Sequence, residues 1–140
     1  MPMTTSSDGG DRMPFAHIIL SGSNIDERVK TSIRESVERL LIDILGNSPQ
    51  FLSVVIQEIP CGDWHVGGHV QGFSAYAHVR VTEGRTTEEA RAKFIAALYE
   101  ALVILAGGAL SEATYIVVEE MPANSWGFGG ITQKIRKQMK

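Results

Sequence analysis

An internal repeat constrains the fold of this chain more than any other feature of its sequence. Two segments match at a single offset of 62 positions. The matched pairs are Glu58 and Glu120, Pro60 and Pro122, Trp64 and Trp126, Gly67 and Gly129, and Gly68 and Gly130. Upstream of Ser21 the offset becomes 61, where Phe15-Ala16-His17 matches Tyr76-Ala77-His78. Because one offset fits all five pairs, we infer that a structural unit has been duplicated within one pseudo-symmetric domain.

The domain organisation follows from this repeat. A chain of 140 residues has the length of one domain and can bury roughly two thirds of the surface that it exposes when unfolded. We assign repeat one to residues 14–72 and repeat two to residues 73–140. Residues 1–13 are rich in Thr, Ser, Gly and Asp, and this composition predicts a disordered extension.

Each copy carries the pattern strand, helix, strand. Apolar, β-branched runs at residues 15–20, 51–59, 75–82 and 114–121 predict four strands. Apolar residues at helical spacing predict two helices, with Asn24 and Thr86 as amino-terminal caps and Gly46 and Gly108 near their ends. A strand, helix, strand unit is a right-handed parallel crossover. The expected fold is therefore α+β, a four-stranded mixed sheet with two helices on one face.

The other face of this sheet is expected to be covered. Strand segments such as Val54-Val55-Ile56 and Ile116-Val117-Val118 are apolar on both sides. Burial of the second apolar side requires association, and a closed homo-oligomer is the usual solution.

The composition of the chain limits the kinds of partner that it is expected to bind and the cellular compartment in which it is expected to occur. The net charge of −3 argues against a nucleic-acid surface. Cys61 is the only cysteine, which excludes an intrachain disulfide and favours a reducing, cytoplasmic compartment. No apolar run has the roughly 18 to 20 residues of a membrane span, and the polar start lacks the apolar region of a signal peptide. The basic residues at the carboxyl end are expected on a solvated helix terminus: Lys134, Arg136, Lys137 and Lys140.

Three motifs carry a resemblance to a known family. They are Met13-Pro14 directly before the first strand, Glu83-Gly84-Arg85 at a strand-to-helix turn, and the segments Glu58-Ile59-Pro60 and Glu120-Met121-Pro122, each leading to Trp and Gly-Gly. They resemble the tautomerase superfamily, which includes 4-oxalocrotonate tautomerase, macrophage migration inhibitory factor and cis-3-chloroacrylic acid dehalogenase. The resemblance covers nearly all of the chain from Met13 onward. It implies a tandem β-α-β fold and a homotrimer in which three sheets surround a central space.

The resemblance also implies a catalytic group. Similar enzymes use an amino-terminal proline, and Pro14 is the matching residue here. A free α-amino group titrates near about 7.7 to 8.0, and desolvation or a neighbouring cation lowers that pKa. Such an amine can take a proton from a carbon beside a carbonyl and return it elsewhere. Within a peptide bond the same nitrogen is an amide without basicity, so this role requires a chain that starts at Pro14.

Other site residues follow from the same resemblance. Arg85 matches the arginine that binds the substrate carboxylate, and Trp64 and Trp126 fall where the family places an aromatic wall. Ser23 and Ala75 stand at the equivalents of Arg85 and Pro14 in the opposite copies, so one site per chain is expected. No metal or cofactor is expected. The potential metal ligands Cys61, Asp63, His65 and His69 are not kept in repeat two, and His17 and His78 are expected to be structural.

The implied activity is proton transfer in a small enol or 2-oxo acid, with a carboxylate substrate as the partner. Ser53 and Tyr115 stand where the family has a second carboxylate-binding arginine, which argues against a dicarboxylate. Thr82 and Phe128 stand where the dehalogenase has an arginine and a water-activating glutamate, although Arg80 on the same strand could compensate in part. The alternatives are a decarboxylase or a dehalogenase/hydratase of three-carbon acids, or a non-catalytic trimeric scaffold if Pro14 stays within the chain.

Overall fold

The computed structural model describes residues 13–139. The disordered extension expected over residues 1–13 therefore lies outside the described residues, except for Met13. The side chain of Met13 is buried, at 9% exposure, against the start of the first strand.

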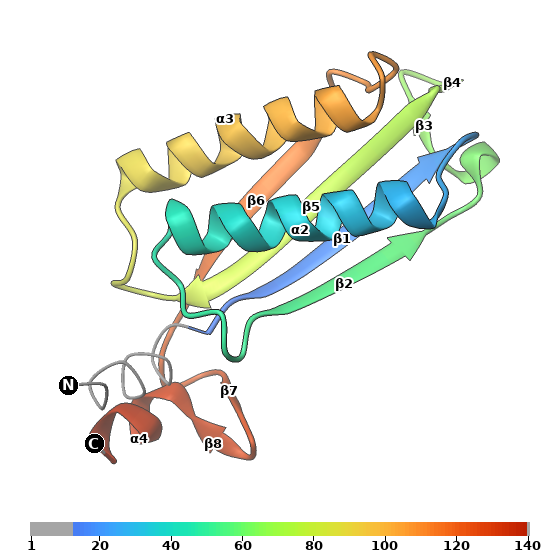
Figure 1. The fold of residues 1–140 in the computed structure, drawn as a ribbon. Helices are drawn as coiled ribbons and strands as arrows, with labels where there is room; N and C mark the ends of the chain where they lie inside the picture. The colour runs from blue at the N-terminus through green and yellow to red at the C-terminus, as the bar shows by residue number, and fades with distance from the viewer. Residues whose placement is uncertain (1–12, 140) are drawn as a thin grey trace.

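Four long strands form one mixed sheet in the order β2-β1-β5-β6 (Figure 1). Their bounds are β1 Phe15–Gly22, β2 Ser53–Glu58, β5 Phe73–Thr82 and β6 Tyr115–Met121. β1 is parallel to β2, β5 is parallel to β6, and the two central strands β1 and β5 are antiparallel. His17 lies opposite His78 across the central pair. Because these residues also match in the repeat, the pseudo-twofold axis passes between them, and the expected sheet is confirmed.

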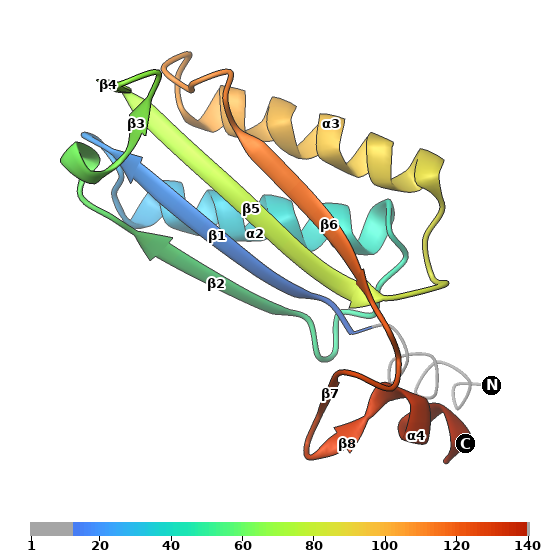
Figure 2. The same cartoon turned by 180° about the vertical axis from the view of Figure 1, so that it is seen from behind.

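Two long helices, α2 (Glu27–Asp43) and α3 (Glu88–Leu105), cover the same face of this sheet (Figures 1 and 2). Side chains alternate between the two faces of a strand, and those of β1 and β5 that point towards the helices form the core. The buried core residues include Ala16, Ile18, Leu20, Ala77 and Val79 from the strands and Ile33, Val37, Phe94 and Leu98 from the helices. No helix within residues 13–139 has the length and hydropathy needed to cross a membrane.

Both helices begin later than the sequence predicts. Asp26 caps α2, because its carboxylate accepts a hydrogen bond of 2.9 Å from the backbone N–H of Val29. The prediction that Asn24 caps this helix is therefore wrong, because Asn24 lies two residues before the observed cap. A carboxylate at this position also interacts favourably with the helix dipole.

In repeat two, Thr87 rather than Thr86 caps α3, and its hydroxyl accepts from Ala90 N at 3.0 Å. Thr86 has a different partner: its hydroxyl lies 3.3 Å from Oε2 of Glu120, which also accepts from the backbone N–H of Gly84. Arg91 adds a charge contact to the same carboxylate oxygen at 3.5 Å. Glu120 thus ties the end of β6 to the turn between β5 and α3, so Thr86 is not available as the cap.

The repeat equivalent, Glu58, makes a simpler contact of the same kind. Its carboxylate lies 3.0 Å from the ammonium of Lys30 in the first turns of α2. The hydrogen bond to Glu58 raises the pKa of Lys30 above its ordinary value. Each repeat therefore uses its matched glutamate to join a strand end to the start of its own helix.

Short hairpins follow β2 and β6 and lie at opposite ends of the sheet (Figure 1). The first follows the 3-10 helix η1 (Cys61–Asp63) and pairs β3 (His65–Val66) with β4 (His69–Val70); the second pairs β7 (Gly127–Phe128) with β8 (Ile131–Thr132) and leads into α4 (Gln133–Gln138). Both glycines of each Gly-Gly pair have positive φ, between 59° and 85°, as a two-residue type I′ turn requires. The repeat matched these glycines between the two copies, but the sequence analysis did not predict the hairpins.

The face of the sheet opposite the helices carries exposed apolar side chains. Val55, Val117 and Tyr115 have 43%, 37% and 70% of their surfaces exposed. Polar pairs lie between them: His17 Nε2 is 2.9 Å from Gln57 Oε1, and His78 Nε2 is 2.7 Å from Glu119 Oε1. Gln57 and Glu119 are also repeat equivalents, so the two copies place matched pairs on this open face.

Candidate active site

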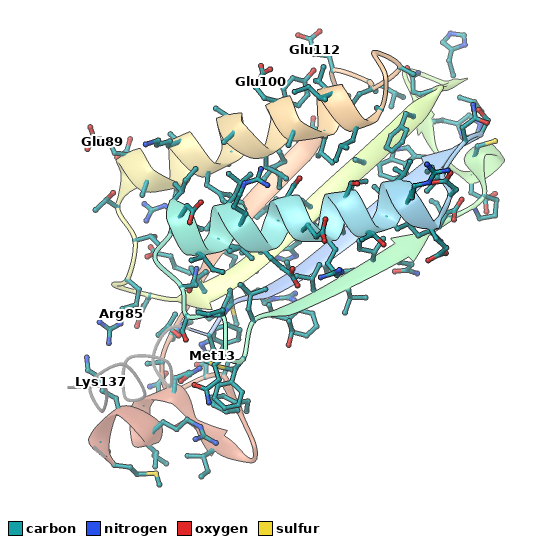
Figure 3. All side chains as sticks on the ribbon, in the orientation of Figure 1. Met13, Arg85, Glu89, Glu100, Glu112 and Lys137 are labelled. Atoms are coloured by element: carbon teal, nitrogen blue, oxygen red, sulfur yellow. The ribbon has the colours of Figure 1, made fainter. Side chains whose placement is uncertain are left out.

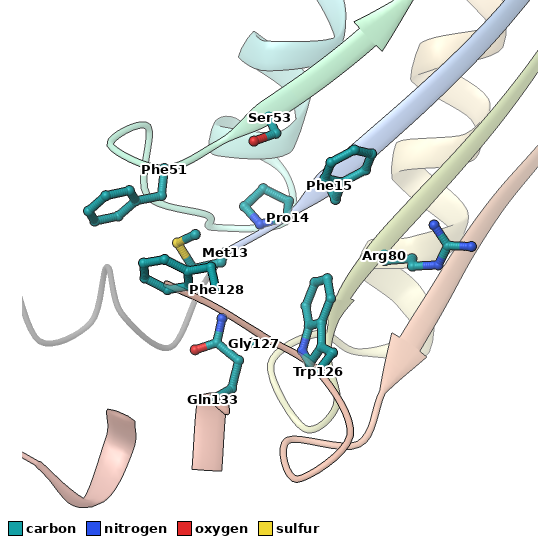
Figure 4. Close-up of a pocket in the computed structure, with 10 residues that line it drawn as sticks. All are labelled: Met13, Pro14, Phe15, Phe51, Ser53, Arg80, Trp126, Gly127, Phe128 and Gln133. Atoms are coloured by element: carbon teal, nitrogen blue, oxygen red, sulfur yellow. The ribbon is translucent and has the colours of Figure 1, made fainter. Parts of the chain in front are cut away.

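A cavity of about 270 Å³ lies where β1 begins and the β7–β8 hairpin folds back towards it (Figure 4). Segments far apart in the chain meet here: the start of β1, the start of β2, the end of β5 and the segment that joins β6 to α4. The residues that line it are Met13, Pro14, Phe15, Phe51, Ser53, Arg80, Trp126, Gly127, Phe128 and Gln133. Most of these side chains are apolar, and four of them are aromatic.

Pro14 is held at the start of β1 by the neighbouring strand. Its carbonyl oxygen accepts a hydrogen bond of 3.3 Å from Ser53 N, and its ring lines the cavity. In this chain its nitrogen is joined to Met13, whose buried side chain lines the same cavity. Release of Met13 would therefore both expose the amine and enlarge the space beside it.

Trp126 forms one wall of the cavity and is fixed from two sides. Its indole N–H donates to the Thr82 hydroxyl at 3.2 Å, and its carbonyl accepts from Gln133 N at 2.9 Å. Trp64, the repeat equivalent, precedes β3 at the opposite end of the sheet and is not among the residues that line this cavity. Of the two predicted tryptophans, the structure therefore brings only Trp126 to Pro14.

Phe51 and Phe128 form the wall opposite Trp126. Their ring centroids are 4.9 Å apart, and the guanidinium carbon of Arg136 lies 3.7 Å from the centroid of the Phe128 ring. Arg136 Nη2 also donates to the Phe128 carbonyl at 3.1 Å. The prediction that the side chain of Arg136 is solvated is wrong. The β7–β8 hairpin reverses the chain before α4, and the Arg136 guanidinium packs on the ring of Phe128.

Two arginines lie at this end of the sheet, in different positions. Arg80 lines the cavity, and its Nε is 3.7 Å from Glu119 Oε1. Arg85, the arginine predicted to bind the carboxylate, lies on the turn between β5 and α3 (Figure 3) and is not among the lining residues. From the sequence, Arg80 was only a residue that could compensate in part for a missing arginine. In the structure it lies on β5, opposite Phe15, and lines the cavity.

Phe51 and Gln133 were missed by the sequence reasoning. Phe51 is not matched by an aromatic residue in repeat two, so no repeat signal was available for it. Gln133 did have a signal, because Gln71 precedes it by the same offset of 62. Across residues 13–139, no group of three or more His, Cys, Asp or Glu side chains is placed to hold a metal ion.

Comparison with known proteins places this geometry in a family. The family of tautomerase enzymes matches residues 76–133. The probable tautomerase K2 of Dickeya dadantii (strain 3937) is 32% identical over 56 residues, which are 40% of this chain and 84% of that protein. The chain belongs to the tautomerase superfamily. The superfamily match lies in repeat two. The candidate site of this tautomerase-superfamily chain combines residues of both copies, because Pro14 and Phe51 of repeat one line the same cavity as Trp126 of repeat two.

Solved structures share the superfamily fold. The structure of Pt0534 inactivated by 2-oxo-3-pentynoate has a TM-score of 0.77 and 23% identity, over 86% of this chain and 98% of that chain. A fused 4-OT described as a wild-type symmetric trimer has a TM-score of 0.71 and 22% identity, over 87% and 96% of the two chains. At these identities the likeness establishes the fold alone, which confirms the tautomerase-like arrangement expected from the sequence.

Proposed function

We propose that this tautomerase-superfamily chain catalyses 1,3-proton transfer in a small enol or 2-oxo acid, with the amine of Pro14 as general base. The observation that carries the proposal is that Pro14 lines a largely aromatic cavity that Arg80 also lines. Apolar walls exclude water and disfavour the ammonium form of an amine. An arginine supplies an anchor for the carboxylate that such substrates carry.

The composition of the cavity supports proton transfer rather than addition of water. None of the described residues that line the cavity carries a carboxylate to activate a water molecule. Phe128, at the position of the dehalogenase glutamate, places its ring in the wall. Proton transfer needs only a base and a site that binds the substrate, and this chain can supply both without a cofactor.

The amino terminus of the protein purified from its host tests the proposal. An intact mass that corresponds to a chain beginning at Pro14, together with turnover of an enolpyruvate-type acid, supports it. An intact mass that corresponds to a chain beginning at Met1 or Pro2 would mean that the Pro14 nitrogen is part of a peptide bond, which contradicts its role as the base.

We propose that Arg80 binds the substrate carboxylate inside the cavity, and that Arg85 acts at the mouth or in the assembled oligomer. Arg80→Gln is expected to lower kcat/KM by about tenfold to a hundredfold, because a charge-assisted hydrogen bond contributes roughly 1.5 to 3 kcal/mol. Arg85→Gln is the matched comparison at the same end of the sheet. Steady-state kinetics decide between the two arginines: a large loss only in Arg85→Gln would return the carboxylate site to the residue that the sequence predicted.

A homotrimer is proposed as the working assembly. The exposed apolar residues of the open sheet face, such as Val117 and Tyr115, require cover, and the structurally similar fused 4-OT is described as a trimer. Sedimentation equilibrium is expected to give three times the mass of one chain. A monomer at micromolar concentration would refute this assembly.

A further inference from the structure

Arg80 has an acidic neighbour just outside the cavity. Its Nε lies 3.7 Å from Oε1 of Glu119, which is the residue opposite it on β6. Arg80 lines the cavity beside Phe15 (Figure 4), whereas Glu119 is not among the lining residues. Among the described residues that line the cavity, only Arg80 has an ionisable side chain. The charge that a ligand meets at this arginine therefore depends on its pairing with Glu119.

His78 holds the carboxylate of Glu119 in this position. Nε2 of His78 is 2.7 Å from Oε1, the same oxygen that lies near Arg80. An ionised carboxylate can only accept hydrogen bonds, so the ring N–H is the donor. The contact joins β5 to β6 and keeps the negative charge of Glu119 close to the guanidinium.

The repeat shows that the contact with histidine does not need this charge. In repeat one, Gln57 stands at the equivalent of Glu119, and its Oε1 accepts from Nε2 of His17 at 2.9 Å. The equivalent of Arg80 in that copy is Ile19. The copy without the arginine thus has a neutral amide, and the copy with the arginine has a carboxylate. The negative charge accompanies the arginine and not the histidine.

A carboxylate at this distance from Arg80 reduces the attraction between the arginine and an anionic ligand. A ligand carboxylate bound to the guanidinium would lie within roughly one Debye length of Glu119, which is about 10 Å at 0.1 M salt, so the two anions repel. One ligand carboxylate still gains charge-assisted hydrogen bonds from Arg80. A second one finds no further cation among the described lining residues and adds to the repulsion.

We propose that Glu119 determines substrate specificity by restricting the site to monocarboxylates, because its charge repels a second carboxylate on the ligand. This rests on the proposed function for the binding of one carboxylate at Arg80.

Two probes that differ by one charge test the proposal. Succinate and succinamate have the same number of non-hydrogen atoms, but an amide replaces one carboxylate in succinamate. Both carboxyl groups of succinate are ionised at neutral pH. Dissociation constants are measured by titration of the isotope-labelled protein, with the amino terminus that its host leaves, while the backbone amide signals of Arg80 and Trp126 are followed. Succinamate is expected to bind at least about tenfold more tightly than succinate.

Glu119→Gln removes the charge and keeps a side chain that can accept from His78, as Gln57 accepts from His17. The preference for succinamate is expected to fall by about threefold or more, because two unit charges about 8 Å apart interact by this amount even in bulk water. Glu100→Gln is the matched control. It changes the net charge equally, but Glu100 is exposed on α3 (Figure 3), so the preference should stay within about twofold of its original value.

Arg80→Gln separates the failure of this proposal from that of the proposed function. It is expected to weaken the binding of succinamate at least about tenfold. If both probes bind to Arg80→Gln as they bind to the unmodified protein, the proposed carboxylate site is wrong, and the role of Glu119 is overturned with it. If Arg80→Gln loses binding but the preference survives in Glu119→Gln, only the role of Glu119 is overturned.

Three further results would overturn the role of Glu119. The first is an unmodified protein that binds neither probe or does not prefer succinamate. The second is an equal fall in the affinity of Glu119→Gln for both probes, which would mean that Glu119 orients Arg80 and does not select by charge. The third is an equal loss of preference in Glu100→Gln, which would mean that only the net charge of the chain matters. None of these measurements requires turnover, so they do not depend on Pro14 as the base.

Discussion

Pro14→Ala, in a chain that starts at residue 14, is expected to lower kcat/KM by about 10² to 10⁴-fold, which is the usual contribution of a general base. The proline nitrogen is fixed by its ring at the start of β1, where Ser53 N holds the Pro14 carbonyl at 3.3 Å. Alanine keeps an α-amine but frees its rotation and exposes it to more water. The measurement is steady-state turnover of an enolpyruvate-type acid across a range of pH, and turnover should fall as acid protonates the amine.

A chain that starts at Met13 is the matched control for this prediction. It keeps the proline ring and the cavity lining but converts the nitrogen to an amide, so it should be at least as inactive as Pro14→Ala. Circular dichroism and sedimentation of all three chains should agree, because Pro14 is not a member of the hydrophobic core cluster that contains Ala16 and Ile18. Unchanged turnover in either altered chain would exclude Pro14 as the base.

The fold was predictable because two independent signals in the sequence agree. The spacing of apolar residues indicates the strands and helices, and the constant offset between the copies indicates that the strand, helix, strand unit is duplicated. His17 and His78 match in the sequence at an offset of 61, and the same two residues lie opposite each other across β1 and β5. The helix starts were less predictable. Asp26 and Asn24 can both cap a helix, and the choice depends on where the chain leaves the sheet.

The candidate site was predictable only in part, for a geometric reason. The resemblance indicated Pro14 and Trp126, which the structure brings together, and also Trp64, which the symmetry of the repeat places at the opposite end of the sheet. Phe51 enters the cavity from a loop before β2, and Gln133 enters only because the β7–β8 hairpin reverses the chain. Phe51 has no aromatic match in repeat two, and the match between Gln71 and Gln133 does not indicate which of the two glutamines reaches the cavity.

The two copies differ at the positions that the proposed function uses and agree at positions that shape the strand ends and the hairpin turns. The folding residues kept are the matched glutamates Glu58 and Glu120 and the Gly-Gly turns. Ala75 stands at the equivalent of Pro14, and Ile19 at the equivalent of Arg80. A single functional cavity in a symmetric scaffold is the expected result of such divergence, and the hairpin of repeat two determines its shape.

Gly127→Ala is expected to open this hairpin and to remove most of the turnover. A Cβ at Gly127 would lie 2.0 Å from the Ile131 carbonyl oxygen and 2.6 Å from the Thr132 Cα, and neither backbone atom can move while β7 and β8 stay paired. Overpacking against side chains costs about 1 to 3 kcal/mol, and a clash with the backbone costs more. The hairpin should therefore separate and displace Trp126 and Phe128 from the cavity.

Gly62→Ala is the matched control for Gly127→Ala, because a Cβ at Gly62 meets nothing within 4 Å and the residue is not among those with positive φ. Its free energy of unfolding should stay within about 0.5 kcal/mol of the unmodified protein. In Gly127→Ala, kcat/KM should fall at least about tenfold and amide hydrogen exchange should accelerate in residues 126–138. Exchange in the central strands β1 and β5 should stay slow, because their core does not include the hairpin. Full turnover in Gly127→Ala would show that the cavity wall at Trp126 and Phe128 is not needed for the reaction, and that the site must lie elsewhere on the sheet.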